Sequence, residues 1–427
     1  MSAVSRLKQR LIGLLRWSER YTKTDMVYLA SGTFWSNVNA AVVAGLAFLG
    51  SIMFARFLSK DAYGTYQYIL SISGLLTGLT LTGMNSAVTR AVARGHEGEL
   101  KHAVRFQVIA GAIPLIAGVC VALWYFFHGN TGLGLAFAGV AIFMPLGSAY
   151  NTWAAYTGGK KLFRVGTYYG LANNIVSYGS ILLAIFYSRN FLWIVFANFF
   201  FTFLSNFIIY HLVVKNIPPN NERDNETISY GTHLSLMGIL GAIAGQLDAL
   251  LVFHFIGAAA LAVYSFATII PERLSGILKF IPNLMLPKLA PKDENHVRDF
   301  IWKRLWIFLL FIAAVAGAYA LVAPWLFHTF FPQYAASIPF TQIYSLSFFS
   351  LAVLIVQTVL TSLRKTKELY IYSFGQPIIK SILMVTLLYY YGIWGLLWAQ
   401  MIVNFLSLIF QLILLGRKPA QERVQTA

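Results

Sequence analysis

Long runs of hydrophobic residues, separated by short polar stretches, fill almost the whole chain. Each run is about 20 residues long, and as an α-helix rising about 1.5 Å per residue it would cross the roughly 30 Å hydrocarbon core of a bilayer. We therefore predict an all-α membrane protein with about twelve transmembrane helices, near residues 33–55, 66–88, 106–127, 133–154, 167–187, 191–213, 233–256, 260–287, 305–327, 337–361, 369–391 and 393–415.

The polar stretches divide the chain into two halves. The longest of them between hydrophobic runs, residues 214–232, contains Pro218 and Pro219 and follows the sixth run. We predict that it is a cytoplasmic linker between two six-helix lobes, at residues 25–213 and 233–415, with a cytoplasmic tail at residues 416–427.

The first 24 residues differ from the rest of the chain, because six of them are basic. Leu7, Leu11 and Leu14 fall on one helical face among these charges. The pattern is typical of an amphipathic helix on the cytoplasmic membrane surface, and a disordered basic leader is the alternative.

The two halves also show a weak internal repeat. With a shift of 198 positions and no gap, residues 57–66 fall on residues 255–264, Asn85 falls on Asn283, and Arg90 falls on Lys288. Few residues are identical, but a helix pair that recurs at half the chain length is typical of a duplicated transporter. We expect the two lobes to be pseudo-symmetric.

The distribution of basic residues predicts the orientation in the membrane. If the N-terminus is cytoplasmic, the outer loops contain only Arg56, Lys60 and Arg189, and the predicted spans contain only Arg273, Lys279 and Lys380. The remaining 26 of the 32 basic residues then lie in inner segments, as the positive-inside rule requires. Both termini are therefore predicted to be cytoplasmic, and the net charge of +17 has a topological cause that needs no nucleic-acid partner.

Motifs for common enzymatic sites are absent from the sequence. The segment Gly158-Gly-Lys-Lys161 lacks the first glycine and the hydroxyl residue of a nucleotide-binding P-loop, and no HExxH occurs. The eight histidines are scattered, and the single cysteine, Cys120, allows no disulfide and no cysteine-based metal site. We expect no catalytic residues, no metal and no cofactor.

Five charged residues lie inside hydrophobic runs. Such a charge costs about 2.5–3.5 kcal/mol at the bilayer centre, so it usually faces a cavity or a partner. We predict that Arg273 and Lys380 bind an anion. The alternative for Arg273, and for the acids Asp248 and Glu272, is a structural interaction with another helix. Lys279 shares a helical face with Glu272, but it is also close enough to the membrane edge to extend into water.

Two further basic residues, Arg90 and Lys288, close their spans on the cytoplasmic side. They are either topology determinants or, because they match under the repeat, a paired cytoplasmic entrance for an anion. Amides and aromatic rings within the spans could bind sugar hydroxyls and stack on sugar faces, but interhelical hydrogen bonds and interfacial aromatic belts explain them equally well. These weak sugar-contact candidates are Asn37, Asn39, Asn173, Asn174, Tyr168 and Tyr169.

Several segments resemble the polysaccharide-biosynthesis flippases, the oligosaccharidyl-lipid branch of the multidrug/oligosaccharidyl-lipid/polysaccharide exporter superfamily. Residues 54–68, FARFLSKDAYGTYQY, resemble the first-hairpin motif "aR.Ls...yG.y", and residues 81–90 resemble the end of the second span. Gln246-Leu-Asp248, Tyr264-Ser-Phe-Ala267 and Pro287-Lys-Leu-Ala290 resemble the start of the second half. The resemblance covers nearly the whole chain.

The resemblance implies two lobes around a central cavity that opens to each side of the bacterial cytoplasmic (inner) membrane in turn. The implied substrate is an undecaprenyl-diphosphate-linked oligosaccharide for a surface polysaccharide such as exopolysaccharide or O-antigen. Cationic cavity residues would meet the diphosphate, and Arg273, Lys279 and Lys380 fit this role. Transport would be coupled to a proton or sodium gradient, with Asp248 or Glu272 as the site that binds the ion. Partners would be membrane lipids, a polymerase and other polysaccharide-assembly proteins. A multidrug or small-solute antiporter of the same fold is the first alternative, and a membrane-embedded glycan polymerase or ligase is the second.

Overall fold

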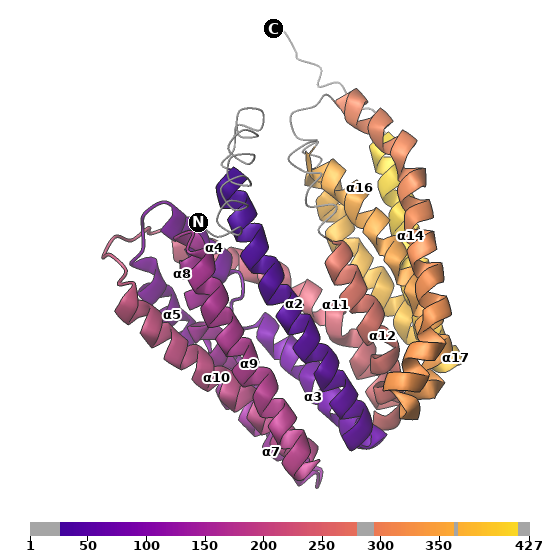
Figure 1. The fold of residues 1–427 in the computed structure, drawn as a ribbon, viewed down its shortest axis with the longest axis horizontal. Coiled ribbons are helices and arrows are strands. Elements are labelled where there is room, and N and C mark those ends of the chain that lie inside the picture. Colours follow the sequence, from indigo (N-terminus) through magenta and orange to yellow (C-terminus); the bar gives the residue numbers. More distant parts are fainter. Residues whose placement is uncertain (1–25, 280–293, 363–365, 417–427) are drawn as a thin grey trace, which may run out of the picture. The chain divides into compact units, whose positions relative to one another are not determined.

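The computed structural model describes residues 26–279, 294–362 and 366–416, and within these ranges every regular element is a helix (Figure 1). The prediction of an all-α fold is confirmed. In chain order the helices are α2 (Met26–Phe57), α3 (Lys60–Gly78), α4 (Met84–Ala93), α5 (Glu99–Ala110), α6 (Ala112–Phe127), α7 (Thr131–Tyr150), α8 (Trp153–Gly159), α9 (Phe163–Ser188), α10 (Phe191–Asn216), α11 (Thr227–Phe255), α12 (Ala258–Leu278), α14 (Glu294–Phe330), η1 (Pro332–Ser337), α15 (Ile338–Tyr344), η2 (Ser345–Phe349), α16 (Ser350–Ser362) and α17 (Thr366–Gly416).

Ten helical segments in the described ranges are long and apolar enough to cross a membrane. They match the predicted spans with two differences. The predicted span at residues 66–88 is divided between α3 and α4, because Leu81 takes a left-handed conformation with φ 57°. The last candidate, residues 375–415, joins two predicted spans, but Gly392 has non-helical angles (φ 59°, ψ −140°) at the predicted boundary between them.

The described chain forms two compact units that interleave in sequence. Unit 1 comprises residues 1–53 and 76–239, and unit 2 comprises residues 54–75 and 240–427. These units differ from the predicted lobes, because most of α3 groups with the second half of the chain and the linker groups with the first. The lobe boundaries at residues 25–213 and 233–415 stay a prediction.

Aromatic packing explains why α3 belongs to unit 2. The ring of Tyr63 on α3 lies 4.9 Å from that of Phe266 on α12 and 6.2 Å from that of Tyr334 in η1. Tyr68, further along α3, stacks on Phe253 of α11 with ring centroids 3.8 Å apart. These large rings bury an extended surface and hold the helices in one register.

In unit 1, α7 packs against α6 and α10, and α10 also packs against α9 (Figure 1). Buried polar side chains connect these helices. The indole N–H of Trp153 on α8 donates to the side-chain oxygen of Asn206 on α10 (3.1 Å). The side-chain amide of Asn206 donates in turn to the backbone carbonyl oxygen of Gly147 on α7 (3.2 Å). Such interhelical hydrogen bonds stabilise helix contacts in a membrane, where burying apolar side chains adds little.

The segment predicted as a linker is fastened to unit 1. Asn220 donates to the carbonyl oxygen of Gly95 (2.8 Å) and accepts from the amide of Glu97 (3.0 Å). The amide of Gly98 donates to the carbonyl oxygen of Glu222 (2.9 Å). Residues 220–222 therefore follow the turn between α4 and α5 through backbone and side-chain hydrogen bonds.

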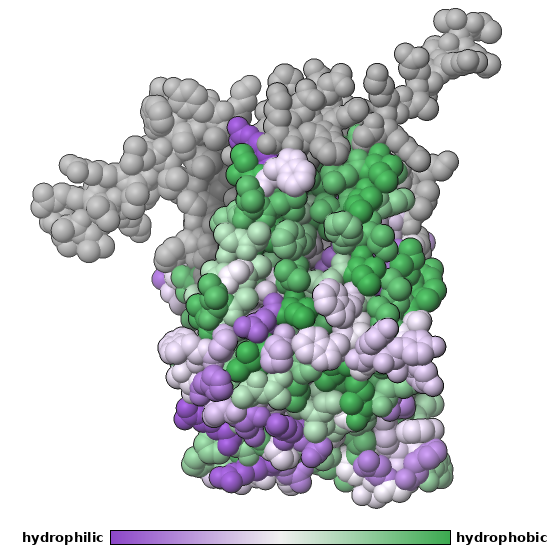
Figure 2. All heavy atoms as spheres, turned by 90° about the vertical axis from the view of Figure 1, so that its right-hand side faces the viewer, coloured by the Kyte–Doolittle hydropathy of each residue, from purple (hydrophilic) through white to green (hydrophobic). Residues whose placement is uncertain are grey.

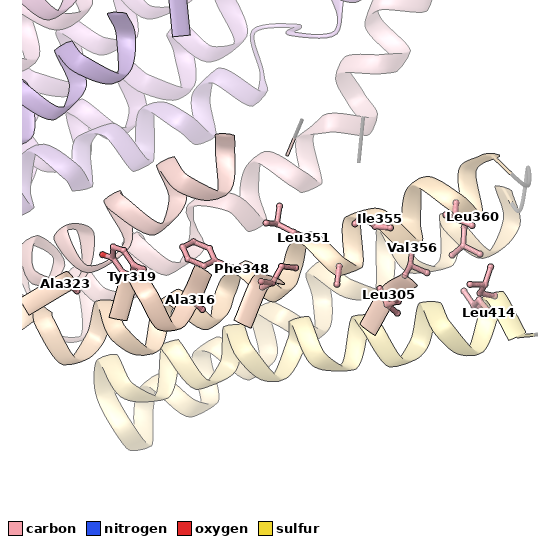
Figure 3. Packing of buried hydrophobic residues seen from close by; sticks show 14 residues of the cluster. Leu305, Ala316, Tyr319, Ala323, Phe348, Leu351, Ile355, Val356, Leu360 and Leu414 are labelled. Atoms are coloured by element: carbon pink, nitrogen blue, oxygen red, sulfur yellow. The ribbon is translucent and has the colours of Figure 1, made fainter. Parts of the chain in front are cut away.

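The core of unit 2 is a column of apolar side chains from α14, η2, α16 and the end of α17 (Figure 3). Ile312, Phe348, Val356 and Leu415 are fully buried in it. Because lipid tails are as apolar as these side chains, van der Waals contacts and shape, more than the hydrophobic effect, hold such a column together.

Hydrophobic side chains cover much of the face drawn in Figure 2, with polar patches between them. On α14, Trp306, Leu310, Leu321 and Trp325 are at least 60% exposed. A soluble protein rarely exposes so large an apolar surface, whereas lipid solvates it. The chain is a multi-pass membrane protein.

Candidate functional site

Asp248 is the first of two acidic side chains that α11 and α12 bring close together in unit 2. The helices are joined at Gly257, whose φ of 119° favours glycine at this sharp turn. One oxygen of Asp248 accepts the hydroxyl of Tyr264 (2.8 Å), and the other accepts the backbone N–H of Ala249 (2.9 Å). Tyr264 is buried, so this carboxylate has a fixed orientation.

Glu272 on α12 is the second acidic side chain, and it accepts the hydroxyl of Tyr344 from α15 at 3.1 Å. Tyr344 is buried, whereas Glu272 itself is exposed. Unit 2 therefore contains two carboxylates on consecutive helices, each held by one tyrosine hydroxyl. Helix α12 runs without a break through Pro271 beside them.

The predicted polar face of α12 is exposed along its length, because Glu272, Arg273, Gly276 and Lys279 are all exposed. Lys279 caps the C-terminal end of the helix. Lys380 lies half-buried on α17. Within the part of the chain that the structure describes, no acidic side chain lies within 4.0 Å of these three basic groups. They are available to an anion, but no contact joins Lys380 to the α12 pair.

The proposed cytoplasmic entrance is only partly described. Arg90 is exposed on α4, and its guanidinium lies 4.8 Å from the ring of Tyr230, a cation–π contact within unit 1. Lys288 lies outside the described residues. The pairing of these two residues therefore stays a prediction.

Most of the sugar-contact candidates gather in unit 1. Asn39 of α2 and Asn173 and Asn174 of α9 line one cavity, and the Asn174 amide donates to the Asn39 carbonyl oxygen (3.2 Å). Tyr168 packs on Trp35, with ring centroids 5.5 Å apart. The hydroxyl of Tyr169 instead accepts a hydrogen bond from the side-chain amide of Asn216 (3.3 Å), so Tyr169 faces α10. The side chain of Asn37 is outside the described part of the structure.

The sequence model of the family described as polysaccharide biosynthesis protein matches residues 29–290, which is more than half of the chain. The chain belongs to this family. No curated protein sequence matches it significantly.

Solved structures with the same fold are membrane transporters. The chain superposes on the lipid II flippase MurJ in an inward closed conformation with a TM-score of 0.67 at 13% identity, covering 91% of this chain and 88% of MurJ. An inward-facing multidrug resistance MATE family transporter of the MOP superfamily gives 0.63 at 13% identity, covering 87% and 94%. An outward-facing MATE family transporter gives 0.57 at 13% identity, covering 90% and 95%. The protein thus has the same all-α fold as these structures.

The sequence indicated the two acids of this site but not the tyrosines that hold them. Tyr264 follows Asp248 by 16 positions, and Tyr344 follows Glu272 by 72. Both tyrosines resemble the many membrane tyrosines that serve as interfacial anchors, so no local signal separates them. Arg164, which contributed only to the topology count, also proves to lie beside Trp35 and Tyr168.

Proposed function

We propose that the protein moves an oligosaccharide linked to undecaprenyl diphosphate from the cytoplasmic to the outer leaflet of the bacterial cytoplasmic membrane, for synthesis of a surface polysaccharide. The observation that carries this proposal is the family match over residues 29–290. The transporter fold supports it, because a flippase must expose one site to each side of the membrane in turn.

The charges of unit 2 suit an anionic headgroup. Arg273 and Lys279 are exposed on one helix and have no acidic partner within 4.0 Å among the described residues. An unpaired cation in a membrane protein is costly, and a diphosphate would relieve that cost through charge-assisted hydrogen bonds. In this mechanism Arg273, Lys279 and Lys380 bind the diphosphate during the crossing.

The carboxylate pair suits a coupling ion. Asp248 and Glu272 are acidic side chains within membrane-spanning helices, where such groups usually bind an ion or a partner, and each accepts one tyrosine hydroxyl. The hydroxyls of Tyr264 and Tyr344 keep donating to an ionised carboxylate and lose much of that interaction once it is protonated. Protonation of Glu272 would therefore weaken the hydrogen bond between α12 and α15, on the helix that carries Arg273 and Lys279.

The deciding experiment deletes the gene and analyses the membrane lipids. We expect complete undecaprenyl-diphosphate oligosaccharide to accumulate at the cytoplasmic face, where an impermeant lectin or glycosidase reaches it only in inverted vesicles. Accumulation at the outer face would instead indicate a polymerase or ligase. No accumulation, together with increased sensitivity to cationic drugs, would indicate a multidrug transporter, and either result would refute the proposal.

A further inference from the structure

A polar cavity of about 450 Å³ lies in unit 1 between α2, the end of α7, α8 and the first half of α9. Its volume lies within the usual range for small-ligand sites. Six of the side chains that line it carry an amide or a hydroxyl, and none of its described lining residues is charged: Asn39, Asn151, Thr157, Thr167, Asn173 and Asn174.

The hydrogen-bonding capacity of this cavity is incompletely used. The side-chain oxygen of Asn173 is buried and has no hydrogen-bond partner among the described residues. Leaving such an atom unsatisfied costs about 1–3 kcal/mol. An amide offers two donors and an acceptor on one side chain, which matches the donors and acceptors of adjacent sugar hydroxyls. A neutral, hydroxyl-rich ligand would hydrogen-bond to the amides and hydroxyls that line the cavity without bringing in a charge.

Three glycines, Gly158, Gly166 and Gly170, contribute to the wall of the cavity. A Cβ atom added to Gly158 would meet no other heavy atom within 4 Å, and one added to Gly170 would lie 3.8 Å from the side-chain oxygen of Asn39. One added to Gly166 would lie 3.2 Å from the Thr157 hydroxyl oxygen. A side chain can therefore be introduced at Gly158 without a steric clash.

Two aromatic rings and a guanidinium belong to residues that are close in sequence to the cavity lining on α2 and α9. Trp35 precedes Asn39 by one turn of α2, and its ring packs on Tyr168 of α9 (5.5 Å). The guanidinium of Arg164 lies 6.0 Å from the Trp35 ring and 5.5 Å from the Tyr168 ring. Tyr168 is half exposed, so part of its face can pack on the apolar face of a sugar ring.

We propose that this cavity, with Trp35 and Tyr168 at its edge, is a carbohydrate-binding subsite that recognises neutral hydroxyl-bearing sugar units. This inference deepens the proposed function and rests on it. The cavity lies at the N-terminal end of α9, which follows Lys160 and Lys161 and is predicted to be cytoplasmic. The glycan would therefore be recognised there before it crosses the membrane.

A cysteine reporter tests the subsite without requiring transport. The full chain with Cys120→Ala and Gly158→Cys carries one thiol on the cavity wall, and Gly179→Cys on α9 is the matched control, because its Cβ also meets nothing within 4 Å and it does not line this cavity. The probe is the oligosaccharide released by acid from the surface polysaccharide of the source cell, added to purified protein during maleimide labelling. At ten times its Kd it should slow labelling of Gly158→Cys about tenfold and leave Gly179→Cys unchanged.

Adding Asn173→Leu to the reporter should abolish this protection, because it replaces an amide of the cavity lining with an apolar side chain. If that variant does not fold, Thr167→Val is a second test, since it removes a cavity hydroxyl at nearly constant volume. Labelling of Gly158→Cys that does not slow, slows equally at Gly179→Cys, or stays protected in both variants would overturn the inference.

The result is separable from that of the gene deletion. Lipid-linked oligosaccharide that accumulates in the deletion strain, with no protection of the reporter, retains the flippase and removes the subsite. Protection without accumulation retains a carbohydrate site and removes the proposed function.

Discussion

Glu97 joins three segments at the predicted cytoplasmic end of unit 1, and removing its charge should loosen them. Both carboxylate oxygens contact Nζ of Lys160, at 2.9 Å and 3.0 Å. One of these oxygens also accepts the hydroxyl of Tyr156 (3.1 Å) and the amide of Asn220 (3.3 Å). The side chain therefore connects the turn after α4, the end of α8 and the segment that follows α10.

The size of the effect follows from these contacts. Glu97→Gln keeps an acceptor for Tyr156 and Asn220 but loses the ion pair, whose side chains are 27% and 17% exposed. Partly exposed pairs of this kind contribute about 1 kcal/mol or slightly less. Glu97→Ala also loses the two other hydrogen bonds, so we expect about 2–4 kcal/mol in total. For a unit of this size, 1 kcal/mol corresponds to roughly 2–4 °C in Tm.

The pH dependence has a defined sign. Burial raises the pKa of the Glu97 carboxyl, but hydrogen bonds from Lys160, Asn220 and Tyr156 and the charge of Lys160 outweigh it and hold this pKa below its ordinary value of 4.5. A carboxyl whose folded pKa is lowered stabilises the protein at pH values above its unfolded pKa and loses that contribution as pH falls through the folded pKa. The difference between wild type and Glu97→Gln should persist at pH 6 and shrink only below about pH 4.5.

The assay is thermal unfolding of the detergent-purified protein, followed by size-exclusion chromatography of the fraction that remains monodisperse. Glu226→Gln, an exposed glutamate of the same segment, is the matched control and should not shift Tm. Lys160→Met should shift Tm as Glu97→Gln does, and the double variant should add little to either. Strictly additive shifts, or equal Tm values for wild type and Glu97→Ala, would refute the coupling between Glu97 and its partners.

Three further predictions follow from the site and the packing. Arg273→Ala and Lys380→Ala should each cause lipid-linked oligosaccharide to accumulate as in the gene deletion, while the amount of the protein in the membrane stays normal. Normal polysaccharide export in both variants would contradict their assignment. Arg189→Ala, in a predicted outer loop, is the control. Tyr264→Phe removes the hydroxyl that lies 2.8 Å from Asp248, and a hydrogen bond to a charged acceptor contributes about 1.5–3 kcal/mol. Under the proposed function, this change should shift the proton or sodium concentration needed for transport about tenfold or more. The control Tyr187→Phe, at an exposed tyrosine, should not shift it. Gly64→Ala would place its Cβ against the carbonyl of Ala258 and should reduce the amount of folded protein severalfold on western blots of membranes, whereas Gly45→Ala, with no neighbour within 4 Å, should be neutral.

Much of the fold could be predicted because membrane insertion imposes simple rules. Span length follows from bilayer thickness, and even the boundary at Gly392 was visible as a gap between two hydrophobic runs. The interruption at Leu81 was not visible, since no local signal marks a leucine that adopts a positive φ. The grouping of α3 with unit 2 depends on ring packing with Phe266 and Phe253, which are about 200 positions away in the sequence.

Residues of the candidate site were easier to predict the more free energy it costs to place their side chains in a membrane. Asp248 and Glu272 were conspicuous because embedded charges are rare, and in the structure each accepts a tyrosine hydroxyl. Neutral groups gave only a weak signal, because an asparagine in a span is usually a structural hydrogen-bond partner. Asn39 and Asn174 are joined by a hydrogen bond, as that reading expects. The side-chain oxygen of Asn173 has no partner among the described residues, and only the structure shows this and the cavity that these residues line.

The two units carry different chemistry, and this difference bears on how such a transporter could change its substrate. The embedded charges Asp248, Glu272, Arg273 and Lys380 all belong to unit 2, whereas the uncharged amide cavity belongs to unit 1. A diphosphate is common to every undecaprenyl-diphosphate-linked glycan, while the sugars differ. If unit 1 binds sugars and unit 2 binds the diphosphate and the coupling ion, substitutions around Asn173 would alter glycan selectivity while leaving the ion dependence set by Asp248 unchanged.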